Sequence, residues 1–209
     1  MSSEISPGTV RNGVALGVIL MGLVVLVSNI AVGYPINDWL TWGAFTFPLA
    51  FLITDLSNRA FGPYRAAKVV GVGFVVGILM SAFLADWMPF MGPPNVLSEI
   101  AVNTAIASGL AFLAGQLLDI AIFQRLRKGV WWRAPLVSSA VASAADTVIF
   151  FYLFFAVFFP YFVPEGSSWY QLGIGDYGIK AAMALALLFP YRLLMGIFAP
   201  HLLSNSVKT

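Results

Sequence analysis

Six apolar stretches, each long enough to cross a lipid bilayer, decide what this chain can fold into. A helix needs roughly 20 apolar residues to cross about 30 Å of hydrocarbon. Of the 209 residues, 60% are hydrophobic and only 10% are charged, whereas soluble domains carry about 25% charged residues. We therefore expect an all-α integral membrane protein, a six-transmembrane-helix bundle that forms a single membrane domain over residues 1–209. The expected spans lie near 13–33, 40–57, 67–88, 101–124, 134–159 and 176–203, and the second is the shortest.

Lysine and arginine fall on one side of these spans. Cytoplasmic loops of membrane proteins carry an excess of these two residues, so this side is expected to be the cytoplasmic one. Both termini are then cytoplasmic, which requires an even number of spans. A cleaved signal peptide at the first stretch is disfavoured, because its removal would leave five. The basic side contains Arg11, Arg59, Arg65, Lys68, Arg125, Arg127, Lys128, Arg133 and Lys208, and the opposite side contains Asp38, Asp86, Glu99, Glu165 and Asp176.

The residues that most enzymes and metal sites need are missing. The chain has no cysteine and a single histidine, His201, which argues against thiolate catalysis and a histidine metal site. It has no phosphate-binding glycine loop and no nucleophile–base pair at a recognisable spacing. The net charge of +2 is too small to suggest a nucleic-acid partner. We therefore expect neither an enzyme nor a cofactor. A channel would need a filter loop or a repeated acidic ring, and nothing in the sequence resembles either.

Ionisable side chains nevertheless occur inside the expected spans. A charge at the bilayer centre costs on the order of 2.5–3.5 kcal/mol on insertion scales, so a span that holds one usually uses or pairs it. Asp55 lies near the inner end of the second span, and Asp119 lies roughly 9 Å above Arg125. Two interpretations stay open for these acids: contact with a substrate, or structural ion pairs with arginines at similar depth, such as Arg59 and Arg192.

Asp146 is harder to explain as a structural acid. It lies 13 residues after Arg133, roughly 20 Å from the inner end and therefore near the midplane. No cation of its own span is within reach, and its best partner is Lys180 in the sixth span. A polar stripe with a period of four residues runs beside it, formed by Ser139, Ser143 and Thr147. A polar core shared by several helices suggests a pocket or a path.

Four passages resemble the queuosine-precursor transporter family, also described as a vitamin-uptake-like transporter family. They are FPLAFLITDLSNRAFGPYRAAKVV at 47–70, IASGLAFLAGQLLDIAIFQRLRK at 106–128, WWRAPLVSSAVASAADTVIFFYLFF at 131–155 and GIKAAMALALLFPYRLL at 178–194. They occur in the family's order and cover most of the chain from the second span onward. There are two departures. The family usually has an acidic residue in the turn where this chain reads Ser57-Asn58-Arg59, and Arg192 after Pro190 is not expected.

The resemblance implies uptake of a 7-deazaguanine, such as 7-cyano-7-deazaguanine, across the inner membrane for tRNA queuosine modification. A guanine-like edge offers an N–H and an exocyclic amine as donors and a carbonyl as acceptor. A carboxylate can accept from both donors, an ammonium or amide can donate to the carbonyl, and aromatic rings can stack on the base. The candidate substrate-binding residues are Asp119, Asp146, Gln116, Asp55, Lys180, Asn29, Phe47 and Phe112, with Phe150 and Tyr191 as further stacking candidates.

Other functions stay open on the sequence alone. The chain could be the substrate-binding subunit of a multi-subunit ATP-driven vitamin importer, since those subunits are also small six-span bundles, or a purely structural membrane subunit. It contains no nucleotide-binding domain, so energy would come from an ion gradient, a separate ATPase or metabolic trapping. Three spans per half permit an inverted repeat. Gly73 and Gly77 form a small-xxx-small pair that lets helices approach closely, and a glycine-lined face would suit a homodimer.

Overall fold

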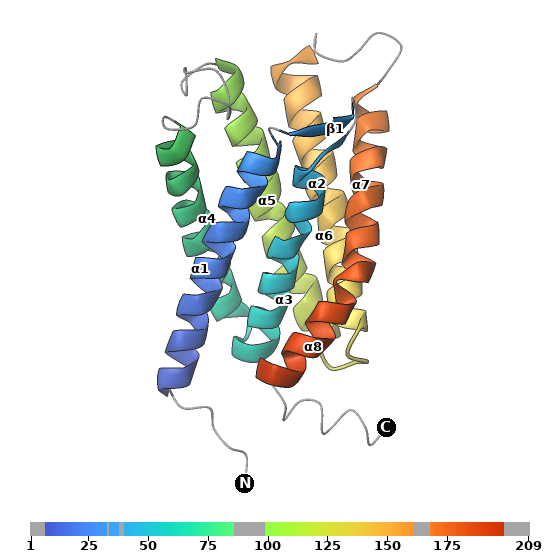
Figure 1. Cartoon of the computed structure of the whole chain (residues 1–209). Helices are drawn as coiled ribbons and strands as arrows, with labels where there is room; N and C mark the ends of the chain where they lie inside the picture. The colour runs from blue at the N-terminus through green and yellow to red at the C-terminus, as the bar shows by residue number, and fades with distance from the viewer. Residues whose placement is uncertain (1–6, 33, 38–39, 86–98, 161–167, 199–209) are drawn as a thin grey trace.

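The computed structural model describes residues 7–32, 34–37, 40–85, 99–160 and 168–198, which form a bundle of helices (Figure 1). The helices run alternately up and down, so α1 begins and α8 ends at the same end of the bundle. In chain order the elements are α1 (Pro7–Val32), β1 (Pro35–Asn37), β2 (Leu40–Thr41), α2 (Gly43–Thr46), α3 (Pro48–Phe61), α4 (Pro63–Ala85), α5 (Glu99–Leu126), α6 (Arg133–Phe151), the π-helix η2 (Tyr152–Phe158), α7 (Trp169–Ala186) and α8 (Leu188–Phe198).

Among the described residues, five segments are long and apolar enough to cross a membrane. They are Pro7–Val32, Pro63–Ser81, Val102–Leu126, Arg133–Phe158 and Trp169–Met195. They correspond to the first, third, fourth, fifth and sixth expected spans, with ends shifted by several residues. The second expected span is divided between α2, with 4 residues, and α3, with 14. These two helices lie within the bundle between α1 and α7 (Figure 1). The chain is therefore a helical, multi-pass membrane protein.

Two prolines mark interruptions in the helices around the centre of the bundle. Proline has no backbone N–H and cannot complete the helical ladder. Pro48 is the first residue of α3, directly after Phe47, which separates α3 from α2. Pro190 lies in the first turn of α8, and its missing N–H removes the helical donor for the carbonyl of Ala186. Figure 1 shows that α8 departs from the direction of α7.

A short antiparallel pair of strands lies at the end of the bundle opposite to the start of α1 (Figure 1). In this pair, Pro35 faces Thr41 and Asn37 faces Leu40. This pair is the only strand structure among the described residues, and the fold is otherwise helical, as expected. The strands contain only three and two residues, which is too short for an alternating apolar pattern to show in the sequence.

Glycines allow α1 and α4 to approach closely. A Cβ atom added at Gly73 would lie 2.5 Å from the Cβ of Met21, and one at Gly77 would lie 2.6 Å from the Cβ of Val25. Both distances are shorter than side-chain contacts permit. The small-xxx-small pair of α4 is therefore used inside the chain, and α1 covers the face that it forms.

We expect Gly77→Ala to destabilise the bundle, because its methyl group would force α1 away from α4. Overpacking of this kind costs about 1–3 kcal/mol. The measurement is thermal unfolding of the purified protein in detergent. Gly71→Ala is the matched control on the same helix, because a Cβ there meets no atom within 4 Å. Equal melting temperatures for the two variants would contradict the packing described.

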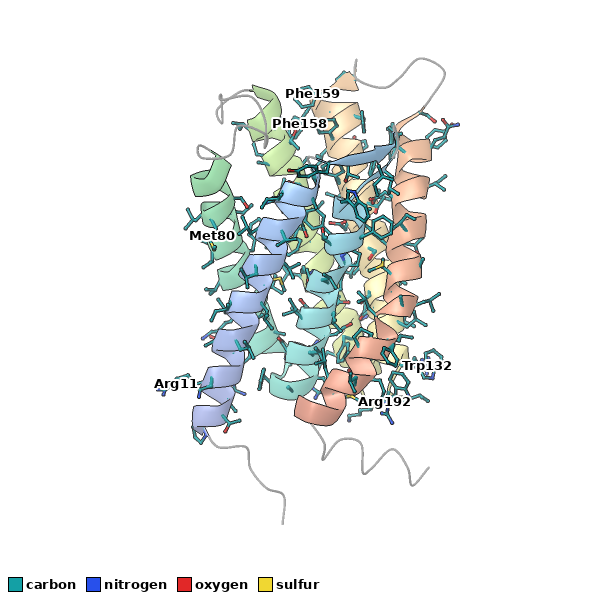
Figure 2. The ribbon with its side chains drawn as sticks, in the orientation of Figure 1. Arg11, Met80, Trp132, Phe158, Phe159 and Arg192 are labelled. Atoms are coloured by element: carbon teal, nitrogen blue, oxygen red, sulfur yellow. The ribbon has the colours of Figure 1, made fainter. Side chains whose placement is uncertain are left out.

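The basic side chains gather at the end of the bundle where α1 begins. Among the described residues, every lysine and arginine except Lys180 lies near this end. Figure 2 shows Arg11, Trp132 and Arg192 there, and Phe158 and Phe159 at the opposite end. The described part of the chain therefore has the one-sided charge pattern on which the predicted orientation depends. Several residues used in that prediction or in the site analysis lie outside the described residues: Asp38, Asp86, Glu165, His201 and Lys208.

Candidate functional site

Buried polar side chains concentrate where α3, α5, α6 and α7 meet. Polar groups inside an apolar bundle are costly unless other polar groups satisfy them, so such a concentration identifies the candidate site. Its buried members are Thr54, Asp55, Gln116, Asp119, Ser138, Ser139, Ser143, Thr147 and Lys180. They come from parts of the sequence more than 100 residues apart, and the bundle brings them together.

Two carboxylates, Asp55 of α3 and Asp119 of α5, form one half of the site, which we call the carboxylate pair. Asp55 is 2% exposed and Asp119 is fully buried. The Ser138 hydroxyl donates to Asp55 Oδ1 at 3.3 Å. The Ser139 hydroxyl lies 3.2 Å from Asp55 Oδ2 and 3.5 Å from Asp119 Oδ1, so it stands between the two acids. Serines of α6 therefore hold the pair in place.

The other half of the site is an ionic group around Lys180, which we call the lysine cluster. Lys180 Nζ lies 2.8 Å from Asp146 Oδ2 and 2.6 Å from Asp176 Oδ2. It also donates to Thr147 Oγ1 at 3.3 Å, and the Thr147 hydroxyl donates to Asp176 Oδ2 at 2.9 Å. The ammonium has three donors and three acceptors around it, so its hydrogen-bonding capacity is filled. The cluster links α6 to α7.

A narrow cavity lies between the carboxylate pair and the lysine cluster. Its walls include Asp55 and Phe51 of α3, Ser139 and Ser143 of α6, Lys180 of α7 and Tyr191 of α8. The residues at the two proline interruptions, Pro48, Leu187 and Leu188, also line it. The free space amounts to about one water molecule, so a flat bicyclic ligand can enter only if side chains or helices move.

Gln116 and Asn58 connect α3 to α5 beside the carboxylate pair. The Thr54 hydroxyl donates to Gln116 Oε1 at 2.5 Å, and Asn58 Nδ2 donates to the carbonyl of Ile120 at 3.1 Å. Gln116 is fully buried, and its Nε2 finds no acceptor among the described residues. Gln116 therefore carries an unused donor next to the acids.

The other candidates from the sequence lie at a second, smaller cavity between α1, α3, α4 and α5. Its walls include Asn29, Phe47 and Phe112. Asn29 donates to the Ser81 hydroxyl at 2.9 Å, and Phe112 stacks on Phe74 with ring centroids 5.3 Å apart. The structure thus separates the predicted residues into two groups. Phe47 is next in sequence to Pro48, which lines the first cavity.

The structural ion pairs that the sequence allowed for Asp55 and Asp119 do not form. Among the described residues, neither carboxylate lies within 4.0 Å of an arginine, a lysine or a histidine nitrogen. Arg59 instead donates to the Tyr191 hydroxyl at 3.0 Å and to the carbonyl of Arg127 at 2.6 Å. The reason is the direction of the Arg59 side chain, which extends toward the basic end of the bundle and donates to the carbonyl of Arg127 there. Arg192 lies over the ring of Trp131, 4.9 Å from its centroid.

The expected partnership of Asp146 with Lys180 is confirmed, but Asp176 is a site residue that the sequence analysis missed. Asp176 is the first residue of the sixth expected span, so the sequence places it only among the acidic residues of the outer side. In the structure α7 begins at Trp169, so Asp176 lies inside the helix. A signal was available, because Asp176 and Lys180 are four residues apart and share one face of a helix.

The arrangement suits the binding of a polar molecule. The described residues contain no group of three or more histidine, cysteine, aspartate or glutamate side chains that could hold a metal ion. What they offer is a set of acceptors and donors on opposite walls of one cavity. Such a set can recognise a polar, flat molecule by hydrogen bonds.

Comparisons with known proteins identify the family of the chain. Residues 41–195 match the family described as "Putative vitamin uptake transporter". The chain is 31% identical over 195 residues to the "Queuosine precursor transporter" of Escherichia coli (strain K12), with 88% of this chain and 87% of that protein covered. It is 37% identical over 157 residues to the "Probable queuosine precursor transporter" of Haemophilus influenzae, with 72% of this chain and 66% of that protein covered.

A third relative, the "Probable queuosine precursor transporter" of Bacillus subtilis (strain 168), is 29% identical over 164 residues, 72% of this chain and 69% of that protein. No solved structure matches the chain significantly. The family match covers most of the chain, including both halves of the site. The chain therefore belongs to this vitamin uptake transporter family.

Proposed function

We propose that this chain imports a queuosine precursor, 7-cyano-7-deazaguanine or a related 7-deazaguanine, across the inner membrane to supply tRNA queuosine modification. The observation that carries the proposal is one cavity with a carboxylate, Asp55, and an ammonium, Lys180, on its walls. The names of the three relatives support the same substrate class. None of those names describes a subunit of an ATP-driven importer.

The cavity suits the hydrogen-bonding edge of a guanine-like base. Asp55 accepts from the ring N–H and from the exocyclic amine, and Lys180 donates to the carbonyl in place of its longest bond, the one to Thr147 at 3.3 Å. Ser139 and Ser143 supply further hydroxyl groups along the wall between them. The rings of Phe51 and Tyr191 stack on the flat base, which needs only an apolar face of adequate size.

The remaining predicted residues surround this contact. Asp146 holds the Lys180 ammonium in place through the 2.8 Å ion pair, and Gln116 and Asp119 form a second layer behind Asp55. Asn29, Phe47 and Phe112 line the second cavity and contact the substrate on its way to the first one. The two cavities are neighbours, because Phe47 lines the second and the next residue, Pro48, lines the first.

We further propose that α2 and α3 together complete a sixth span and that both termini are cytoplasmic. The one-sided distribution of lysine and arginine in the described residues supports this orientation. Asp55, near the middle of the α3 helix, then lies toward the cytoplasmic side of the membrane. The substrate crosses most of the bilayer before it reaches this acid.

The proposal is tested in a bacterial strain that can neither make nor import the precursor. With this chain as the only added protein and 7-cyano-7-deazaguanine in the medium, we expect queuosine to appear in tRNA. We also expect Asp146→Asn to reduce its formation strongly at equal expression, because Lys180 loses one of its two anchoring carboxylates. Absence of queuosine with the wild-type chain, while a known importer restores it, would contradict the proposal.

A further inference from the structure

The carboxylate pair has no counter-charge of its own. Asp55 and Asp119 are 2% and 0% exposed, and among the described residues no cationic nitrogen lies within 4.0 Å of either. The Ser139 hydroxyl lies between them but has a single proton, so it donates to one acid at a time. Two ionised carboxylates in this position would repel each other inside a region of low dielectric constant.

Two unpaired polar atoms point to a missing proton-carrying partner. Asp119 Oδ2 and Gln116 Nε2 have no hydrogen-bond partner among the described residues, although both side chains are fully buried. The Ser139 hydroxyl lies within hydrogen-bonding distance of both carboxyl groups, so the two acids share one site. A carboxyl oxygen becomes a donor only when it carries a proton. The geometry therefore provides a place for one additional proton.

The charged and titratable groups on the surrounding helices do not fill this place. On α7, Lys180 is held by Asp146 and Asp176. On α3 and α8, Arg59 and Tyr191 bond to each other at 3.0 Å. From α6 the pair meets only the hydroxyls of Ser138 and Ser139. The basic residues of the described parts of α1 and α4, which are Arg11, Arg65 and Lys68, are exposed near the basic end.

We propose that the carboxylate pair binds one proton and that substrate import is coupled to the inward movement of this proton. The inference rests on the proposed function, because Asp55 is shared between the pair and the substrate cavity. Asp119 does not line the cavity, so it can hold the proton while Asp55 stays ionised and accepts from the substrate.

The cycle balances one proton against one substrate molecule. With the site open to the outside, the pair takes a proton from the outer solution, which removes one of its two negative charges. The substrate then binds to the remaining carboxylate, and the site closes with a single negative charge. After the site opens inward, the substrate and the proton both leave to the inner solution. The empty pair returns to the outward-facing state without the proton, so each cycle carries one proton and one substrate molecule inward.

The test uses the purified full-length chain in lipid vesicles with tritiated 7-cyano-7-deazaguanine and with the membrane potential clamped. An inward gradient of one pH unit should raise the steady-state ratio of inside to outside substrate about tenfold, for one proton per substrate. A protonophore should return this ratio to one. A sodium gradient of the same size should have no effect, and accumulation driven by sodium would overturn the proton assignment.

The variant Asp119→Asn separates coupling from transport. Asparagine can donate to Asp55 as a protonated acid would, but it cannot release a proton. We expect this variant to exchange substrate across the membrane without a gradient and to lose the tenfold accumulation. Glu99→Gln is the matched control: it removes a carboxylate from the start of the same helix, about 30 Å away, and should accumulate normally.

The outcomes distinguish the two proposals. Substrate exchange by the wild-type chain that ignores the pH gradient would overturn the coupling and leave the proposed function intact. No exchange at all by the wild-type chain would overturn the proposed function and the coupling with it. The wild-type measurements stand on their own, so the result does not depend on whether Asp119→Asn folds.

Discussion

We expect import to be lost and the protein to be destabilised by about 3–5 kcal/mol when Lys180 is replaced by methionine, because the substitution leaves two half-buried carboxylates without their cation. Lys180 is the only cationic residue within 4.0 Å of Asp146 and Asp176 among the described residues, and its own exposure is 7%. Methionine has a similar length and an apolar end, so packing is largely kept while the charge is removed. Thermal unfolding in detergent and substrate uptake in vesicles measure the two effects.

A second substitution separates the two roles of Lys180. In the double variant Lys180→Met, Asp176→Asn, one of the two unpaired charges is gone, so we expect stability to recover in part. We expect import to stay absent, because the cavity still lacks the donor for the substrate carbonyl. The control is Lys68→Met, which removes an exposed lysine that lies over the ring of Tyr64. Full import by Lys180→Met would exclude Lys180 from substrate recognition.

Asp55→Asn is expected to weaken substrate binding roughly 10- to 150-fold, the equivalent of about 1.5–3 kcal/mol for a hydrogen bond to a charged group. The asparagine keeps one acceptor oxygen for Ser138 or Ser139, so the local fold is retained. It places an N–H donor where the substrate also presents donors. Equilibrium binding of tritiated 7-cyano-7-deazaguanine to the purified protein gives the affinity.

An analogue without the exocyclic amine, 7-cyano-7-deazahypoxanthine, makes this prediction specific. The wild-type protein should bind the analogue more weakly than the substrate, because one donor to Asp55 is missing. Asp55→Asn should show little of this discrimination, since its amide cannot accept from both donors. If both proteins discriminate equally between the two ligands, the exocyclic amine is recognised elsewhere and the assigned role of Asp55 is wrong.

The helical architecture could be predicted from the sequence because hydrophobic length is a local property. Five expected spans correspond to helices that are long and apolar enough to cross a membrane. The second did not, because a proline at position 48 divides it and α3 has only 14 residues. Residues 35–37 and 40–41 form strands that are too short to leave a pattern.

The site could be predicted less completely, because its geometry depends on how helices rotate against one another. Sequence spacing identified Asp146 and Lys180 as partners, and the structure places them 2.8 Å apart. Spacing also suggested that Asp55 could pair with Arg59, which is four residues away. The helix instead turns Asp55 toward the serines of α6, while Arg59 bonds to Tyr191. The position of a residue along its helix was predictable, but the direction of each side chain was not.

The interruption at Pro190 weakens the helix at the junction of α7 and α8, beside the cavity. Because the carbonyl of Ala186 has no helical donor, the backbone ladder is weakened at the junction of the two helices, although the Leu187 N–H still donates to the carbonyl of Met183 at 2.8 Å. Three residues at this junction and in α8 line the cavity: Leu187, Leu188 and Tyr191. The hydrogen bond from Arg59 to Tyr191 ties α8 to α3. Arg59 stands in the turn where the family usually has an acidic residue, and through Tyr191 it holds the α8 wall of the cavity.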